Sequence, residues 1–285
     1  MKVELKAYAK INLGLDVLRK REDGYHEVKM IMQTVDLYDK LMLEKIDENR
    51  IELSTNIESL EADERNLVYR AIKLIKDRYN LENGVIARLE KNIPIAAGMA
   101  GGSTDCAAAL KGMNKLFDLH ISDEELMKLG KTLGADVPYC IMGGTALAEG
   151  IGEKLTPLNR ITGDYVVIAK PKIGVSTKYV YENLDLSDNA KHPNINRMIG
   201  YIEEMDKENL FNCIGNILET VTEKKYNVIS EIKEFLKDKG AVNSLMSGSG
   251  PTVFAIFNSK KTAQLACDAI QKEYDLDIAK VVTLI

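Results

Sequence analysis

The chain has 285 residues, of which 45% are hydrophobic and 28% are charged, and its formal net charge is −5. These values are typical of a soluble globular protein with one large domain or, as we expect here, two. The sequence has no Lys/Arg run, no secretory signal and no apolar stretch of membrane-spanning length, so we expect a cytoplasmic protein with no nucleic acid or membrane partner. The four cysteines lie far apart and only three histidines occur, which favours reduced thiols over disulfides or structural zinc.

The first element is a strand. Residues 2–18 alternate with a period of two over much of their length, which predicts one long strand or a strand pair with a bend near Gly14. Lys10 and Asn12 share one face of this strand, opposite Ile11. A solvated lysine on an open sheet is one interpretation of this pattern, and a lysine held at a site is the other.

A turn signal, Asp23-Gly24, precedes the next strand and places Tyr25 and His26 at its start. A histidine in such a position is usually a surface residue. An aromatic residue beside a histidine can also stack on a flat ring and hydrogen-bond its edge. The elements predicted after this turn are strands at 30–35, 40–46, 51–54 and 85–89 and a helix within 63–80.

A glycine-rich stretch over residues 94–105 follows, with glycines at 98, 101 and 102. Glycine allows a tight turn and a close approach of a ligand to the backbone. We expect Ser103 or Thr104 to cap a helix over 103–117, whose first N–H groups and positive dipole end suit phosphate. An ordinary glycine-rich turn before an alanine-rich helix is the alternative.

This stretch matches neither common nucleotide fingerprint. A P-loop needs Lys and a hydroxyl residue directly after its last glycine, but Gly102 is followed by Ser103-Thr104. Gly130-Lys131-Thr132 lacks the first glycine of that motif. Gly248-Ser249-Gly250 lacks the third glycine of a dinucleotide motif. A phosphate site here belongs to another class.

Asp136 follows a helix predicted over 122–133 and lies between small residues and a proline. Such an acid is either a helix cap or salt-bridge partner, or a carboxylate held rigidly at a site. A polar stretch over 152–164 indicates the passage into a second domain. There the element order fits a helix-backed antiparallel sheet and hence an α+β fold, and Ser176 is expected to cap a helix that carries Tyr179 and Tyr181.

Three segments together resemble a known family. The strand ending at residues 9–13, the loop at 94–103 and Ser247-Gly248-Ser249-Gly250-Pro251-Thr252 resemble, in order and spacing, the three motifs of the GHMP kinase superfamily of small-molecule kinases. The resemblance spans the whole chain. It implies a two-domain fold, which we assign to residues 1–155 and 156–285, with an N-terminal half like ribosomal protein S5 domain 2, a ferredoxin-like C-terminal half and a site in the cleft between them.

Within the superfamily, residues 10–13, 23–27, 134–138 and 248–252 resemble the branch that phosphorylates the 2-hydroxyl of 4-diphosphocytidyl-2-C-methyl-D-erythritol with ATP, in non-mevalonate isoprenoid biosynthesis. The turn with Tyr25 and His26 is the most specific of these signals. The resemblance implies Mg²⁺ bridging the ATP oxygens, although no pair of carboxylates presents itself as metal ligands.

The resemblance also implies residue roles. Lys10 would act on the transferred phosphoryl group, and Asp136 would accept or orient the proton of the attacking hydroxyl. The substrate would contact Asn12, Tyr25, His26 and a second aromatic, Tyr181, with Tyr179 as the alternative. The implied ATP-binding residues are Asn66, Pro94, Ala97, Gly98, Met99, Ala100, Gly101, Gly102, Ser103 and Thr104, and those of the C-terminal glycine motif are Ser247, Gly248, Ser249 and Gly250.

Two other functions compete with this one. Another kinase of the superfamily, acting on homoserine or mevalonate, would give Tyr25 and His26 no base to hold. A non-catalytic binding protein on the same fold would normally have lost Lys10 or Asp136, and both are present. The acidic surface without a broad apolar stripe favours a monomer or weak homodimer.

Overall fold

The computed structural model describes residues 1–187 and 191–285, and these form two compact units. Unit 1 contains residues 1–9, 37–95 and 100–143, and unit 2 contains residues 10–36, 96–99 and 144–285. Two long strands, β1 (Lys2–Lys20) and β2 (His26–Ile46), contribute to both units. The units are therefore interleaved along the chain, and the division into 1–155 and 156–285 stays a prediction.

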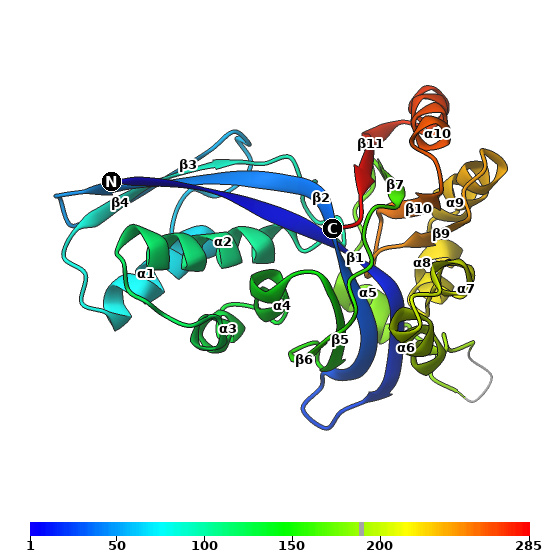
Figure 1. Cartoon of the computed structure of the whole chain (residues 1–285), viewed down its shortest axis with the longest axis horizontal. Coiled ribbons are helices and arrows are strands. Elements are labelled where there is room, and N and C mark those ends of the chain that lie inside the picture. Colours follow the sequence, from blue (N-terminus) through cyan, green and yellow to red (C-terminus); the bar gives the residue numbers. More distant parts are fainter. Residues whose placement is uncertain (188–190) are drawn as a thin grey trace. The chain divides into compact units, whose positions relative to one another are not determined.

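Unit 1 is a sheet with helices on one face (Figure 1). The strands β3 (Ile51–Thr55) and β4 (Gly84–Glu90) extend the sheet from β2, to which β4 is antiparallel, while β3 runs parallel to β4. Residues of β4 alternate between the buried core and the open face, as a half-buried strand requires. The helices are α1 (Leu67–Arg78), α2 (Gly101–Leu116), α3 (Asp123–Lys131) and α4 (Val137–Met142).

The core of unit 1 lies between this sheet and its helices. It contains buried apolar side chains from each layer, among them Leu43, Ile72, Val85, Leu110 and Ile141. Cys106 belongs to this core, and burial raises the pKa of its thiol to about 12, which fits packing better than nucleophilic chemistry.

The helix starts agree with the sequence prediction in α3 and differ in α2. Ser122 caps α3 by accepting the Glu125 N–H at 3.2 Å. The helix α2 begins at Gly101, and its N-cap, Ala100, has φ +58° and makes no side-chain cap hydrogen bond. The prediction that Ser103 or Thr104 caps this helix is therefore wrong. Because Ala100 turns the chain into the helix earlier, both residues lie inside it, and the Thr104 hydroxyl instead donates to the Tyr8 carbonyl at 2.7 Å.

Unit 2 contains the remaining strands. The strand β5 (Thr145–Gly150) pairs with β2 and with β6 (Lys154–Pro157), and β8 (Gly215–Asn216) pairs with β1 beside Gly14. A separate sheet has the order β11-β7-β10-β9, and all its neighbours are antiparallel. Its strands are β7 (Tyr165–Pro171), β9 (Asn243–Met246), β10 (Val253–Phe257) and β11 (Leu276–Thr283).

The helices α9 (Val228–Asp238) and α10 (Lys260–Glu273) pack on this antiparallel sheet (Figure 1). The predicted helix-backed antiparallel sheet and α+β class are confirmed. The other helices of unit 2 are α5 (Thr177–Glu182), α6 (Ile195–Glu203), α7 (Lys207–Asn212) and α8 (Glu219–Lys225).

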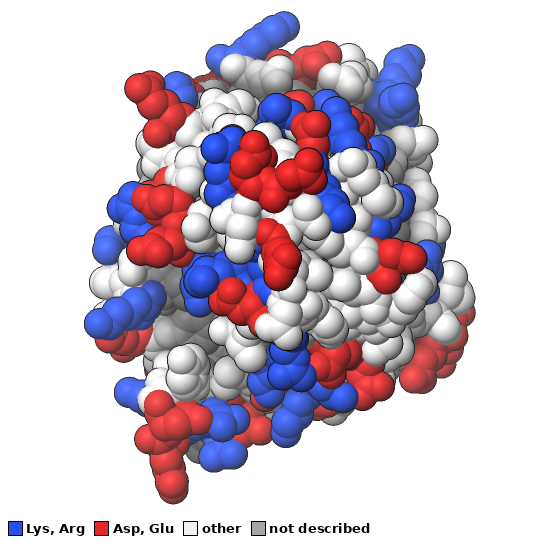
Figure 2. Space-filling view, turned by 90° about the vertical axis from the view of Figure 1, so that its left-hand side faces the viewer, with Lys and Arg blue, Asp and Glu red and all other residues white. Residues whose placement is uncertain are grey.

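The surface carries charges of both signs. On the face shown in Figure 2, acidic and basic side chains are interspersed, so neither sign dominates this face. Within residues 1–187 and 191–285, no helix combines the length and the apolar character needed to cross a bilayer.

Candidate active site

Gly98 is where three distant segments of the sequence meet within unit 2. It has φ +71°, and a Cβ built on it would lie well under 3.0 Å from the Ser247 carbonyl oxygen, so that only glycine fits. Its own carbonyl accepts hydrogen bonds from the Ser247 hydroxyl at 2.9 Å and from the Lys10 ammonium at 3.3 Å. The glycine loop, β1 and the C-terminal glycine motif are thereby joined at one carbonyl group.

Lys10 is buried rather than solvated, with only 6% of its surface exposed, which excludes the open-sheet interpretation. Its ammonium donates to the Asn12 side-chain oxygen at 2.7 Å as well as to Gly98. Asn12 is fully buried, and its amide donates to the sulfur of Met30 at 3.4 Å. An ammonium has three N–H donors, and two are used within the described residues. The third can donate to an oxygen of a ligand.

The C-terminal glycine motif is anchored from two sides. Asn216 donates to the carbonyls of Met246 at 2.8 Å and Gly248 at 2.7 Å. The Ser249 hydroxyl pairs with Thr177 at the start of α5 at 2.8 Å. Sequence reasoning missed Asn216, because its strand β8 is only two residues long and carries no periodic signal.

In unit 1, the loop continues into α2. The N–H groups of Gly101, Gly102 and Ser103 precede the first intrahelical hydrogen bond, which the Thr104 N–H donates to Ala100 at 2.9 Å. Gly102 is exposed and Ser103 partly so, and these N–H groups and the Ser103 hydroxyl are therefore accessible donors. Such a helix start attracts phosphate through its free N–H groups and its dipole.

Asp136 lies at the N-cap position of α4, yet its side chain makes no cap hydrogen bond. The helix-cap interpretation is therefore wrong, and the partly buried carboxylate does not stabilise the helix that it begins. A Cβ built on Gly134 would lie 3.9 Å from the Ser103 hydroxyl oxygen, so the backbone two residues before Asp136 adjoins the start of α2. The segment that leads into Asp136 is therefore a neighbour of the first turn of α2.

An aromatic cluster in unit 2 contains two of the predicted substrate residues. The rings of His26 and Tyr181 have centroids 5.0 Å apart and planes inclined by 43°. Burial, and then the charge of Lys20, lowers the pKa of His26, which favours its neutral imidazole. Tyr25 is 61% exposed, and its N–H donates to the Asp23 carboxylate at 3.1 Å, which fixes the turn. An exposed aromatic next in sequence to one member of a ring pair can offer a stacking surface to a planar ligand.

Tyr179 has a different neighbour from Tyr181. The Lys225 ammonium lies 3.5 Å from the centroid of the Tyr179 ring, which is a cation–π contact. As predicted, Ser176 caps α5 and accepts the Tyr179 N–H at 3.3 Å. Of the two tyrosines named from the sequence, Tyr181 is therefore the one paired with His26.

Asn66 caps α1. Its side-chain oxygen accepts the Val68 N–H at 2.9 Å, and its amide donates to the Glu61 carbonyl at 2.7 Å. These two hydrogen bonds hold the Asn66 side chain at the start of the helix. Its contact with adenine remains a prediction.

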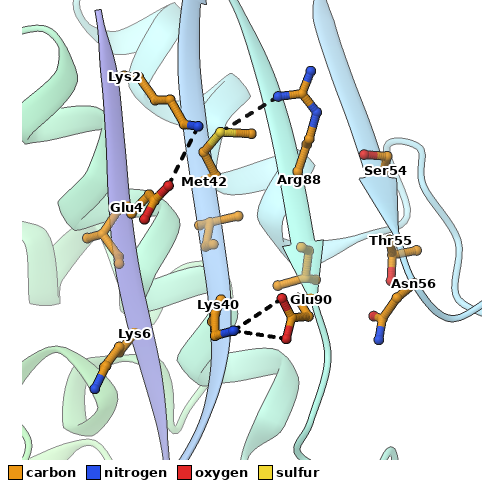
Figure 3. Close-up of a pocket in the computed structure, with 13 residues that line it drawn as sticks. Lys2, Glu4, Lys6, Lys40, Met42, Ser54, Thr55, Asn56, Arg88 and Glu90 are labelled. Carbon is orange, nitrogen blue, oxygen red and sulfur yellow. Dashed lines mark hydrogen bonds and ion pairs between the residues drawn. The ribbon is translucent and has the colours of Figure 1, made fainter.

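A depression of about 850 Å³ on the open face of the unit 1 sheet contains none of the predicted site residues (Figure 3). Its charged side chains pair with one another, as in Lys40–Glu90 at 3.1 Å and Lys2–Glu4 at 3.6 Å. Figure 3 shows these side chains standing on adjacent strands over the face away from the helices. This pattern is typical of a solvated sheet face.

Comparisons with known proteins show the family to which the chain belongs. Residues 66–144 match the GHMP kinases N terminal domain, and residues 195–276 match the GHMP kinases C terminal domain. A protein of Lachnoclostridium phytofermentans, named 4-diphosphocytidyl-2-C-methyl-D-erythritol kinase, is 54% identical over 93% of this chain and 91% of its own length. A protein of the same name from Lachnospira eligens is 52% identical over 95% of this chain and 94% of its own length.

Solved structures of related proteins also indicate this family. The crystal structure of a 4-(cytidine 5′-diphospho)-2C-methyl-D-erythritol kinase superposes with a TM-score of 0.84 at 30% identity, covering 99% of both chains. A homoserine kinase from Cytophaga hutchinsonii has a TM-score of 0.80 at 21% identity, covering 100% of this chain and 94% of its own, and shows the shared fold. The chain belongs to the GHMP kinases, in the branch of the 4-diphosphocytidyl-2-C-methyl-D-erythritol kinases.

Proposed function

We propose that this protein transfers the γ-phosphoryl group of ATP to the 2-hydroxyl of 4-diphosphocytidyl-2-C-methyl-D-erythritol, releasing ADP and the 2-phosphate. Relatives at 50–54% identity over nearly the whole chain carry the name of this activity. The observation that supports the substrate assignment is the ring pair of His26 and Tyr181, with the exposed Tyr25 next to His26 in the sequence, because a small acceptor without a nucleobase would give these rings nothing to bind.

Phosphoryl transfer requires mainly that the protein positions both substrates and neutralises charge on the γ-phosphoryl oxygens. The N–H groups at the start of α2 would bind the ATP phosphates. Lys10 would donate its third N–H to the transferred group or orient the attacking oxygen. A compact cation on a rigid strand, fixed by Asn12 and the Gly98 carbonyl, suits this task because it needs little reorganisation.

Asp136 would accept the proton of the attacking 2-hydroxyl, or orient that hydroxyl by accepting its hydrogen bond. The Asp136 side chain makes no cap hydrogen bond to α4, which supports this assignment because its carboxylate oxygens do not bond the helix start. The loose transition state of phosphoryl transfer makes positioning as important as proton removal.

Mg²⁺ prefers oxygen ligands and usually keeps several waters, bound through substrate phosphates and one or two protein groups. Within the described residues, no three His, Cys, Asp or Glu side chains cluster as a metal site. The Ser103 hydroxyl, a hard oxygen at the phosphate-binding end of α2, fits as a single protein ligand. When bound, the ion would neutralise charge on the ATP oxygens.

An ADP-release assay with three acceptors tests the proposal: the cytidyl-methylerythritol, homoserine and mevalonate. We expect release with the cytidyl substrate alone, and a large rise in its KM in His26→Ala. Release with homoserine or mevalonate would favour another GHMP kinase activity, and release with none would favour a binding protein. We further propose that the protein is cytoplasmic. We also propose that it is a monomer or weak homodimer, and sedimentation would test this oligomeric state.

A further inference from the structure

Unit 1 contains a buried cluster of one lysine and two aspartates to which no role has been assigned. The Lys91 ammonium contacts a carboxylate oxygen of Asp39 and lies 2.6 Å from one of Asp105. The three side chains are between 0% and 5% exposed. Ionic groups buried to this degree lose much of their hydration, and their mutual attraction offsets that loss only in part. The presence of such a cluster does not by itself show that it stabilises the fold. Its position next to the glycine loop indicates a role in holding that loop.

The cluster holds the entrance of the glycine loop. Lys91 directly follows β4, and Asn56 brackets its backbone by accepting its N–H at 2.7 Å and donating to its carbonyl at 3.2 Å. The second oxygen of Asp39 accepts the N–H groups of Asn92 and Ile93, the latter at 2.7 Å. One carboxylate therefore fixes the two residues that lead into Pro94.

The same cluster also holds the exit of the loop. Asp105 lies in the second turn of α2, the helix whose first N–H groups form the phosphate-binding end. A Cβ built on Gly101 would lie 3.3 Å from the Lys91 nitrogen, so the ammonium packs directly beneath the first turn of this helix. A cation at a helix N-terminus is unfavourable, and the negative charge of Asp39 beside Lys91 offsets that repulsion.

The charges of the cluster do not balance if both acids are ionised. One oxygen of Asp105 has no hydrogen-bond partner within the described residues. Burial raises the pKa of Asp105 to about 8, against the opposing attraction of Lys91, which favours the protonated acid and with it a cluster that is neutral overall. A neutral cluster beneath the phosphate-binding end avoids repelling an anionic ligand.

We propose that Lys91, Asp39 and Asp105 are positioning residues that fix both ends of the glycine loop and thereby set its affinity for the ATP phosphates. This inference rests on the proposed function of the loop. A positioning role differs from that of an ordinary structural ion pair in its effect on the substrates. Disturbing the cluster should weaken the binding of ATP much more than the binding of the cytidyl substrate.

The test compares Lys91→Met, Asp105→Ala and Asp105→Asn with Lys76→Met. Lys76 is a matched control, since it is also a buried lysine of unit 1, but it donates to the Leu81 and Asn83 carbonyls at the end of α1. The measurements are kcat, KM for each substrate, the Kd of a fluorescent ATP analogue and the urea midpoint.

We expect Lys91→Met and Asp105→Ala to raise KM for ATP and the analogue Kd at least tenfold, while KM for the cytidyl substrate changes less than twofold. Asp105→Asn keeps the shape and an acceptor for Lys91, so its effect should be smaller than that of Asp105→Ala. Lys76→Met should lower the urea midpoint without changing KM for ATP.

ATP affinities within twofold of wild type in all the cluster variants would overturn the inference, whatever their stabilities. If Lys91→Met does not fold, the ATP affinities of Asp105→Ala and Asp105→Asn decide the question, with the same twofold limit. Wild-type protein that binds no ATP analogue would instead overturn the proposed function together with this inference.

Discussion

The close approach of Gly98 to Ser247 predicts a large effect of one methyl group. Gly98→Ala would place a Cβ well under 3.0 Å from the Ser247 carbonyl oxygen and 3.2 Å from that of Gly250, and both are backbone atoms that move only with their chain. The substitution also requires alanine at φ +71°. Two hydrogen bonds to the Gly98 carbonyl, from Lys10 and Ser247, depend on the same position.

The expected cost follows from these parts. A left-handed conformation in a residue other than glycine costs about 1–2 kcal/mol. Forcing a methyl group into a filled space costs about 1–3 kcal/mol, and each strained hydrogen bond contributes about 0.5–1.5 kcal/mol. Since the loop can relax in part, we expect Gly98→Ala to lose about 3–5 kcal/mol in total.

Two matched substitutions in unit 2 separate these contributions. Gly163 has φ +87° with nothing within 4 Å of a built Cβ, so Gly163→Ala should lose only the conformational part, about 1–2 kcal/mol. Gly200 lies in α6 with open space and no positive φ, so Gly200→Ala should be neutral or stabilising by up to about 1 kcal/mol.

Urea unfolding of the four proteins measures these free energies. We expect the order Gly200→Ala, wild type, Gly163→Ala, Gly98→Ala from most to least stable, with loss of kinase activity in the last. A Gly98→Ala protein as stable as Gly163→Ala would show that the loop does not press against the C-terminal glycine motif, and our account of this contact would fail.

Four further predictions concern the site. Asp136→Asn removes no cap hydrogen bond, so it should keep its stability within about 0.5 kcal/mol while kcat falls at least about 100-fold; normal turnover would remove Asp136 from the mechanism. Tyr181→Ala should raise KM for the cytidyl substrate about tenfold through lost stacking, whereas Tyr179→Ala, the control facing Lys225, should leave KM unchanged. The lowered pKa of His26 keeps its imidazole neutral at lower pH than usual, so KM for the cytidyl substrate should stay constant down to the ordinary histidine pKa and rise only below it; a rise beginning above that value contradicts the assignment. Because the pKa of Asp105 is raised, the folded state binds this proton more tightly than the unfolded state. The stability that protonated Asp105 contributes should therefore be lost as pH rises from about 4 toward 8. Urea titrations at each pH should show that Asp105→Asn abolishes this part of the pH dependence.

The strands and the helix caps were largely predictable, because period-two alternation and cap residues are local signals. Ser122 and Ser176 cap the predicted helices, and Tyr25-His26 follows the predicted turn. The start of α2 was not predictable, since it depends on Ala100 entering a left-handed conformation that alanine rarely adopts. A helix that begins in this way has no side-chain cap, and its first residue therefore carries no signal in the sequence.

The position of Lys10 was predicted from a strand pattern, but its burial was not. Alternation places Lys10 and Asn12 on one face without saying what covers that face, and only the fold brings Gly98 to them. The buried cluster was missed entirely, because Asp39, Lys91 and Asp105 look like ordinary charged residues in their own segments. Contacts between segments distant in sequence carry no local signal.

The most direct test of the central claim is the identity of the phosphorylated product. Purified protein would be incubated with ATP, Mg²⁺ and 4-diphosphocytidyl-2-C-methyl-D-erythritol, and followed by phosphorus NMR alongside Asp136→Asn and Lys10→Met. We predict one new phosphomonoester signal, coupled to the position-2 carbon, with ADP in equal amount, and its near absence in both variants. A phosphoryl group at another hydroxyl, or equal product from the variants, would contradict the account.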